Sequence, residues 1–266
     1  MILKSVNEGL RFAFSPKVIV PYFILNMIIF YTLINLFIGI ADFNSVRPIY
    51  WFFFFIGIYL PVFIIIGLLY LWFHGAVIDQ AKYYPKNRSL AKSFGYSGSR
   101  YLTMLCAMIL HGIIIAIAAS PPYIGALISF VVGLFLFYLY QAIIIDKKGC
   151  IDSFKKSVNT FSKYPLETFV TWLLTVIISV IIVIIFALPL LLFIIGWMGG
   201  MPKLPTAVGV EPQTTIKNLL PILPAVVSSP YFIVYLFIFS VGLAYTSAFQ
   251  LGTKTKLYIN ARKVEL

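Results

Sequence analysis

Six long apolar stretches follow one another along the chain, and none of them contains Asp, Glu, Lys or Arg. They cover Val18–Ile40, Ile49–Phe73, Leu102–Ala119, Tyr123–Ile145, Thr168–Trp197 and Tyr231–Gln250. Each is longer than the ~17 residues that a helix needs to cross about 30 Å of hydrocarbon. Apolar and polar residues do not alternate within them, which argues against barrel strands. The pattern predicts an all-α integral membrane protein with a single six-helix transmembrane domain over residues 1–266.

The six predicted helices form three hairpins, and a short lead-in segment precedes each hairpin. The lead-ins read "LKSVNEGLRFAF", "SLAKSFGYSGSRY" and "CIDSFKKSVNTFSKYP". Each has a serine followed by an apolar residue, and Ser97 and Ser157 recur in the same register of the second and third. These similarities favour a threefold repeat of lead-in plus hairpin. Chance similarity among short polar loops is the alternative.

The third lead-in has the periodicity of an amphipathic helix. At about 100° per residue, one arc holds apolar side chains and the opposite arc holds polar ones. The apolar arc contains Cys150, Ile151, Phe154, Val158 and Phe161, and the polar arc contains Asp152, Lys155, Lys156, Asn159 and Lys163. Such a helix lies in the membrane interface. We expect Lys155, Lys156 and Lys163 to face anionic headgroups, and Phe154 and Phe161 to anchor the helix in acyl chains or against neighbouring helices.

The first lead-in behaves in the same way, with Ile2, Val6 and Leu10 opposite Lys4 and Glu8. The second contains Gly95 and Gly98, and because glycine disfavours helix it is predicted to be a weaker helix.

Composition and charge support the membrane assignment and give an orientation. The chain is 61% hydrophobic and 11% charged, with a net charge of +12, whereas soluble domains carry about 25% charged residues. Of its 20 basic residues, 17 lie on one side of the predicted helices. Positive loops stay in the cytoplasm, so both termini are predicted to be cytoplasmic in the cell membrane. The basic charge is therefore a topology signal that also attracts anionic lipids, and nucleic acid is not a predicted partner.

The stretch "IIIDKKGCIDSFKKSVNTFSKYPLETFVTWLL" resembles the signature of an uncharacterised group of archaeal and bacterial polytopic membrane proteins. It is similar to the membrane domain fused to some glycerophosphodiester phosphodiesterases. In that group an apolar helix ends in Asp, and a Gly turn and an amphipathic helix carrying Ser follow. Asp146, Gly149 and Ser157 occupy those places, while Val158 stands where the group often has an aromatic residue. The resemblance implies no known reaction, and the sequence shows no phosphodiesterase catalytic domain.

Two polar residues within the predicted spans are candidates for function. His111, in "AMILHGIII", is an ionisable group inside a predicted helix, where it would serve a proton relay or contact a ligand. The alternative is a neutral imidazole that bonds to a neighbouring helix. Asn26 in the first helix would line a cavity or join helices by a hydrogen bond.

Asp79 and Asp146 end the second and fourth predicted helices, where a carboxylate opposes the helix dipole. A lysine or arginine of the following lead-in is the simplest compensation, and a shared cation site is the alternative. Cys106 inside a helix and Cys150 on the cytoplasmic side lie in places that do not favour a disulfide.

Phosphate-binding glycine loops, nucleophile elbows and zinc motifs are missing from the sequence. It therefore predicts no cofactor, no metal and no enzyme. The first hypothesis is a non-enzymatic scaffold, accessory or lipid-organising membrane protein whose partners are anionic lipids. A protein partner or homo-oligomer is compatible with this role. The alternative is a transporter or channel subunit with a polar pathway near His111 and Asn26.

Overall fold

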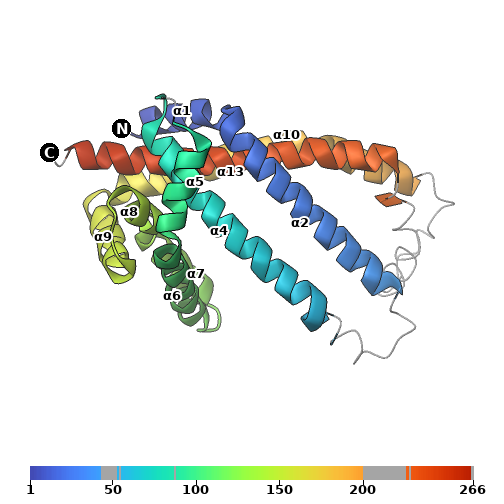
Figure 1. The fold of residues 1–266 in the computed structure, drawn as a ribbon, viewed down its shortest axis with the longest axis horizontal. Coiled ribbons are helices and arrows are strands. Elements are labelled where there is room, and N and C mark those ends of the chain that lie inside the picture. Colours follow the sequence, from blue (N-terminus) through green and yellow to red (C-terminus); the bar gives the residue numbers. More distant parts are fainter. Residues whose placement is uncertain (43–52, 54, 87, 200–225, 228, 265–266) are drawn as a thin grey trace. The chain divides into compact units, whose positions relative to one another are not determined.

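The computed structural model describes residues 1–42, 53, 55–86, 88–199, 226–227 and 229–264. In this part of the chain, six helices are long and apolar enough to cross a membrane. They confirm the predicted all-α membrane fold, and Figure 1 follows them along the chain. Their bounds are Pro16–Leu36, Phe55–Tyr83, Tyr101–Ala119, Gly125–Ile145, Pro165–Gly196 and Pro230–Val264.

Eleven elements make up the described residues. They are α1 (Ile2–Ala13), α2 (Pro16–Asp42), η2 (Phe55–Tyr59), α4 (Leu60–Tyr83), α5 (Leu90–Ser99), α6 (Tyr101–Ala119), α7 (Gly125–Phe135), α8 (Leu139–Ile145), α9 (Cys150–Lys163), α10 (Pro165–Gly199) and α13 (Pro230–Val264).

The chain divides into two compact units. Unit 1 comprises Met1–Tyr22, Gly67–Val180 and Tyr245–Leu266, and unit 2 comprises Phe23–Ile66 and Ile181–Ala244. Unit 2 consists of apolar helix segments that pack through aromatic rings, such as Phe23 against Phe237 at 4.6 Å between centroids. Nearly all of the charged side chains that the structure describes lie in unit 1, which therefore holds the chemistry of interest.

The three lead-in helices of unit 1 pack against other helices through small residues. Ser5, Ser93, Ser97, Ser153 and Ser157 are completely buried. The Oγ of Ser97 in α5 donates to the carbonyl of Trp72 in α4 at 2.7 Å, and α9 packs on α8 and α7. Small residues allow helix backbones to approach closely, so this serine stripe is what the lead-ins share.

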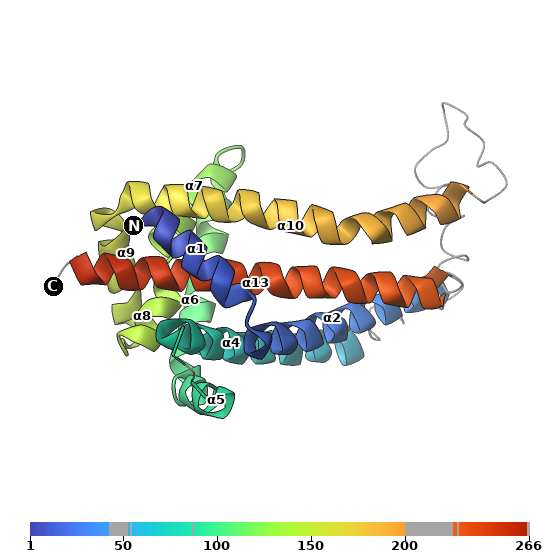
Figure 2. The same cartoon turned by 90° about the horizontal axis from the view of Figure 1, so that it is seen from above.

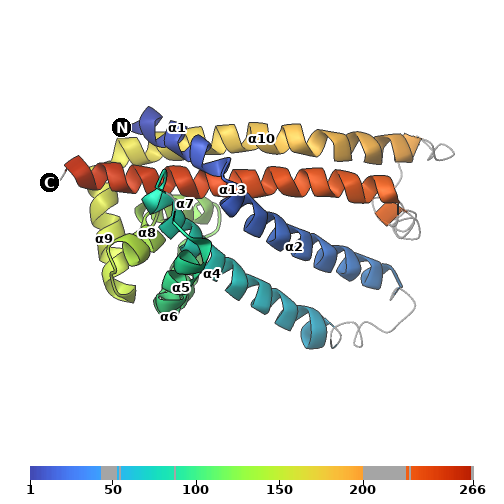
Figure 3. The same cartoon turned by 45° about the horizontal axis from the view of Figure 1, so that its top comes forward.

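The first lead-in helix, α1, packs on the last helix, α13, as Figure 3 shows. Gly9 of α1 stands four residues after Ser5, the register that Ser97 holds relative to Ser93. A Cβ at Gly9 would lie 2.7 Å from the backbone nitrogen of Thr253. The Nδ2 of Asn260 donates to the Ser5 Oγ at 3.0 Å. Each lead-in thus packs on other helices of unit 1, and α1 does so on the helix farthest from it in sequence.

The second lead-in forms a full helix, α5, although its glycines predicted a weak one. Phe94 packs edge-on against Trp72 and Phe73 of α4, with centroids 5.3 and 5.0 Å away. The Trp72 Nε1 also donates to the Phe94 carbonyl at 3.0 Å. Tertiary packing therefore outweighs the low helix propensity of Gly95 and Gly98.

Two helices run further than the apolar pattern predicted. The second predicted span ended at Phe73, whereas α4 continues to Tyr83, and the last ended at Gln250, whereas α13 continues to Val264. Both extensions are packed in protein: Val77, Ile78, Leu257 and Tyr258 are at most 3% exposed. The predicted spans ended several residues before the first charged residues, Asp79 and Lys254, because the prediction used lipid as the only apolar surroundings.

The fourth span is interrupted where the sequence predicted one continuous helix. α7 ends at Phe135 and α8 begins at Leu139. Ser157 of α9 fills the break, since its Oγ donates to the Phe135 carbonyl at 2.8 Å and accepts from the Tyr138 nitrogen at 3.1 Å. Without this hydroxyl, backbone groups freed by the break would be buried without partners, which is costly.

Candidate functional site

The helix α9 turns its small residues towards the protein and its apolar arc outwards. Ser153, Ser157 and Thr160 are buried, whereas Ile151 is 66% and Val158 38% exposed. Phe161 differs from these two, because its ring packs on Phe135 with centroids 4.6 Å apart. Phe154 is half-buried. The helix therefore presents apolar side chains outwards without a protein surface to cover them.

Beside this apolar arc lies the predicted basic face. Lys155 and Lys163 are exposed and Lys156 is half-buried. The helix α1 places Leu3, which is 78% exposed, beside the exposed Lys4 and Arg11, and Phe14 directly after the helix is 69% exposed. The N-terminus, the C-terminal end of α13 and α9 gather at one end of unit 1, as Figures 1 and 2 show. We call it the basic end.

A basic groove of about 260 Å³ lies between α4 and α5. It is lined by Tyr83, Lys86, Arg88, Ser89 and Lys92. Its cationic and hydroxyl side chains are groups that bind phosphate oxygens.

Asp79 sits within α4, one turn before the helix ends, rather than at its end as predicted. Its carboxylate is 1% exposed and lies 2.6 Å from the Nε of Arg88, a residue that leads into α5. This Nε lacks hydrogen-bond alignment, so the contact is an ion pair. The Ser93 Oγ donates to the same carboxylate at 2.8 Å. Arg88, which stands directly before the following lead-in, thus compensates Asp79, whereas the expected cation was a lysine or arginine of the lead-in itself.

Asp146 follows α8 directly and pairs with a residue that the sequence analysis did not single out. Arg262 of α13 places its Nη1 2.7 Å from Oδ1, and the Tyr258 hydroxyl donates to Oδ2 at 2.6 Å. The expected partner was a lysine or arginine of the following lead-in, whereas Arg262 belongs to the last helix. The contact with Arg262 spans 116 positions, so no local pattern indicated it. No group of His, Cys, Asp and Glu that could hold a metal occurs within the described ranges.

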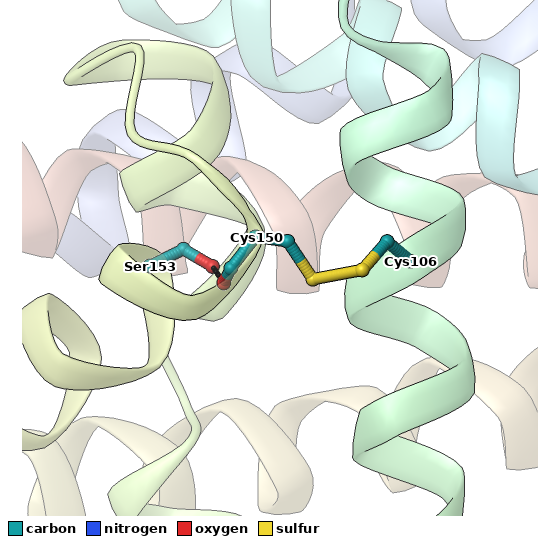
Figure 4. The surroundings of a disulfide bond; sticks show 3 residues. All are labelled: Cys106, Cys150 and Ser153. Atoms are coloured by element: carbon teal, nitrogen blue, oxygen red, sulfur yellow. Dashed lines mark hydrogen bonds between the residues drawn. A yellow bond between two sulfur atoms is a disulfide. The ribbon is translucent and has the colours of Figure 1, made fainter.

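A disulfide joins Cys106 of α6 to Cys150 at the start of α9, which overturns the expectation of two separate thiols (Figure 4). Their Cα atoms are 6.1 Å apart, within the usual range for a disulfide. Cys106 lies in the second turn of α6, close to the basic end, and not deep in the span. The Ser153 Oγ donates to the Cys150 carbonyl at 2.5 Å.

The disulfide predicts how many cysteine thiols react with maleimide before and after reduction. The purified protein, denatured without reductant, should take up no maleimide, and after reduction it should take up two per chain, because Cys106 and Cys150 are its 2 cysteines. Mass spectrometry of the labelled protein measures this. Two labels before reduction would contradict the bond.

The two polar candidates of the spans lie in different surroundings. Asn26, in unit 2, donates from its Nδ2 to the Ser240 carbonyl of α13 at 3.3 Å, so it joins two helices. His111 is half-buried on α6. The structure gives neither residue a place on the lining of the cavity described next.

A cavity of about 280 Å³ lies inside unit 1, where the sequence predicted no site. Its polar and aromatic lining comes from α2, α4, α10 and α13 and from the break between α7 and α8. The lining residues are Tyr22, Tyr70, His74, Phe137, Trp172, Thr175, Val176, Ser247, Gln250, Leu251 and Lys254.

Lys254 is the charged group of this lining. The sequence assigned it to the cytoplasmic tail, but it lies in α13, eight residues and about 12 Å of helix before Arg262. Its Nζ lies 4.5 Å from the centroid of the Phe137 ring. A cation–π contact contributes about 0.5–2 kcal/mol, whereas burial of an ammonium costs several kcal/mol. Among the described residues Lys254 forms no ion pair, so the contact offsets only part of this cost.

Comparison with protein-family models, curated proteins and solved structures finds no match for this chain. The resemblance of the Asp146–Ser157 region to the archaeal and bacterial membrane group stays a prediction.

Proposed function

We propose that the protein is a non-enzymatic integral membrane protein that organises anionic lipids at its basic end. The observation that carries this proposal is the three-sided arrangement of α9. Its serines pack on protein, its apolar residues Ile151 and Val158 are exposed, and its lysines flank them. An exposed apolar arc next to lysines matches the boundary between acyl chains and headgroups.

Two further features of unit 1 support the proposal. The helix α1 carries the same combination of exposed apolar side chains and basic residues at the same end. The basic groove offers the cations of Lys86 and Lys92 to a phosphate, while Arg88 in its lining pairs with Asp79. A lipid headgroup on either surface would gain charge-assisted contacts, each basic residue contributing about 1 kcal/mol near an anionic surface.

We propose further that the basic end is cytoplasmic in the cell membrane. The support is the concentration of 17 of the 20 basic residues on one side of the spans. The other three, Arg47, Lys203 and Lys217, lie outside the described residues. The disulfide favours an oxidising compartment, but intracellular proteins of hyperthermophiles also carry disulfides. A cytoplasmic basic end is therefore compatible with the disulfide.

The lipid-organising role predicts a preference for anionic lipid that depends on α9. In vesicles of mixed lipid, spin-labelled phosphatidylglycerol should associate with the protein more strongly than spin-labelled phosphatidylcholine. Replacing Lys155, Lys156 and Lys163 by glutamine should reduce this preference several-fold, with ~1 kcal/mol per lysine as the upper bound.

The matched control for this experiment changes the same helix without changing its charge, as Asn159→Ala with Ser162→Ala does. Both side chains are exposed, so the preference should remain. An unchanged preference in the lysine variant would contradict the proposed role.

The transporter or channel subunit stays the alternative. A polar pathway near His111 and Asn26 is its premise, but the Asn26 amide is engaged with the Ser240 carbonyl. The geometry of α9 therefore supports the lipid-organising role better.

A further inference from the structure

The lining of the cavity within unit 1 carries charge of one sign. Lys254 contributes a cation, and no carboxylate stands among the lining residues. The His74 Nε2 is buried and has no hydrogen-bond partner in the part of the chain that the structure describes. The ring of His74 is held between Tyr70 and Tyr140, with centroids 6.2 and 5.3 Å away. The cavity thus holds a buried imidazole nitrogen without a partner and, among the described residues, an ammonium without an ion pair.

The remaining lining is suited to an organic molecule rather than to a bare ion. Phe137, Trp172 and Leu251 supply apolar surface, and Ser247 and Thr175 supply hydroxyl groups. Pockets for small molecules combine apolar walls with a few polar groups in this way.

We propose that this cavity binds a small organic anion, a carboxylate or phosphate group joined to a short apolar part. The anionic oxygens pair with Lys254 and accept from the imidazole of His74, while the apolar part packs on Phe137 and Trp172. A water molecule occupies about 30 Å³, so the 280 Å³ cavity corresponds to roughly nine waters. It takes a short-chain acid or the headgroup of a lipid, but not the two acyl chains of that lipid.

This anionic group has two sources, a lipid headgroup or a free anion. Lys254 lies about 12 Å of helix from Arg262 at the basic end. The inference goes beyond the lipid-organising role, because it rests on the cavity and not on α9.

The probe for this site is 6-bromohexanoate, whose nine non-hydrogen atoms match the estimated size of the cavity. Bromine quenches nearby tryptophan fluorescence, and Trp172 lines the cavity. The protein is placed in phosphatidylcholine nanodiscs and titrated with the probe. The signal of interest is the difference in quenching between the native protein and Trp172→Phe, which removes background from the other tryptophans.

The expected result is saturable quenching of Trp172. Lys254→Gln should weaken binding about tenfold or more, which corresponds to about 1.4 kcal/mol, whereas Lys254→Arg should retain it. Lys148→Gln, at an exposed position of the turn before α9, is the matched control and should bind as the native protein does. The cationic analogue 6-bromohexylamine should not quench saturably.

Competition distinguishes the sources of the anion. Phosphatidylglycerol in the nanodiscs should compete if the occupant is a lipid headgroup, and inorganic phosphate should compete if it is a free anion. Either result supports the proposal, and failure of both counts against it.

Quenching without saturation, equal binding by Lys254→Gln, or equal quenching by the amine would overturn the proposal. If Lys254→Gln fails to fold, quenching of the native protein by 6-bromohexanoate is compared with quenching by 6-bromohexylamine. This comparison still tests whether the cavity selects an anion. Replacing Lys155, Lys156 and Lys163 of α9 by glutamine should leave the saturable quenching of Trp172 by the probe unchanged, so failure of the cavity proposal is separable from failure of the lipid-organising role.

Discussion

Replacing Arg88 by methionine is expected to destabilise the protein by about 3 kcal/mol or more. The change leaves the Asp79 carboxylate, which is 1% exposed, without its cation, and an uncompensated buried charge costs about 3–5 kcal/mol. The Ser93 hydroxyl still donates to Asp79, which places the effect nearer the lower value. The midpoint of thermal unfolding in detergent measures the change.

A double-mutant cycle separates this pairing from other effects of Arg88. Asp79→Asn should cost less than Arg88→Met, because the side chain of Arg88 is 23% exposed and reaches solvent when its partner is neutral. The double variant should be no less stable than Arg88→Met alone. Lys86→Met, at an exposed position of the same loop, is the control and should change stability little. Additive losses in the cycle would show that the pair does not act as described.

The second large effect is expected from Gly9→Ala in α1. The added methyl group would overlap the Thr253 hydroxyl and come within 2.8 Å of the Thr253 Cα. Because backbone atoms of α13 cannot rotate away, α1 has to shift, and overpacking of this kind costs about 1–3 kcal/mol. The expected result is a lower unfolding midpoint with faster amide exchange over Ile2–Ala13.

The control is the same substitution at Gly95 of α5, where a Cβ would meet nothing within 4 Å. There alanine should be neutral or stabilise the helix by about 0.5–1 kcal/mol. If the two substitutions have the same effect, α1 does not pack on α13 through Gly9.

The hydrophobic pattern was sufficient for the class of fold, because crossing a bilayer imposes a length and an absence of charge that can be read locally. The serine register of the lead-ins was also visible, and Ser93, Ser97, Ser153 and Ser157 prove to be buried. The sequence did not show which partners these serines have. The bond from Ser157 to the Phe135 carbonyl depends on a helix break that neither proline nor glycine marks.

The candidate site was less predictable because its contacts are distant in sequence. Asp146 with Arg262 and Asn260 with Ser5 span 116 and 255 positions. Lys254 was assigned to a solvated tail because charge was taken as the end of a helix. A local signal did exist, since Ser247, Leu251 and Lys254 recur at helical spacing on one face, and that face lines the cavity.

The position of α9 relative to lipid is the most direct test of the proposed lipid interface. Single spin labels are placed at Ile151, Val158, Lys155 or Asn159 in a Cys106→Ala, Cys150→Ala background, and collisions with oxygen and with a water-soluble nickel complex are measured in vesicles. We predict that Ile151 and Val158 favour oxygen, which concentrates among acyl chains, and that Lys155 and Asn159 favour the nickel complex. Equal nickel accessibility at all four positions would place α9 in water and contradict the proposed lipid interface.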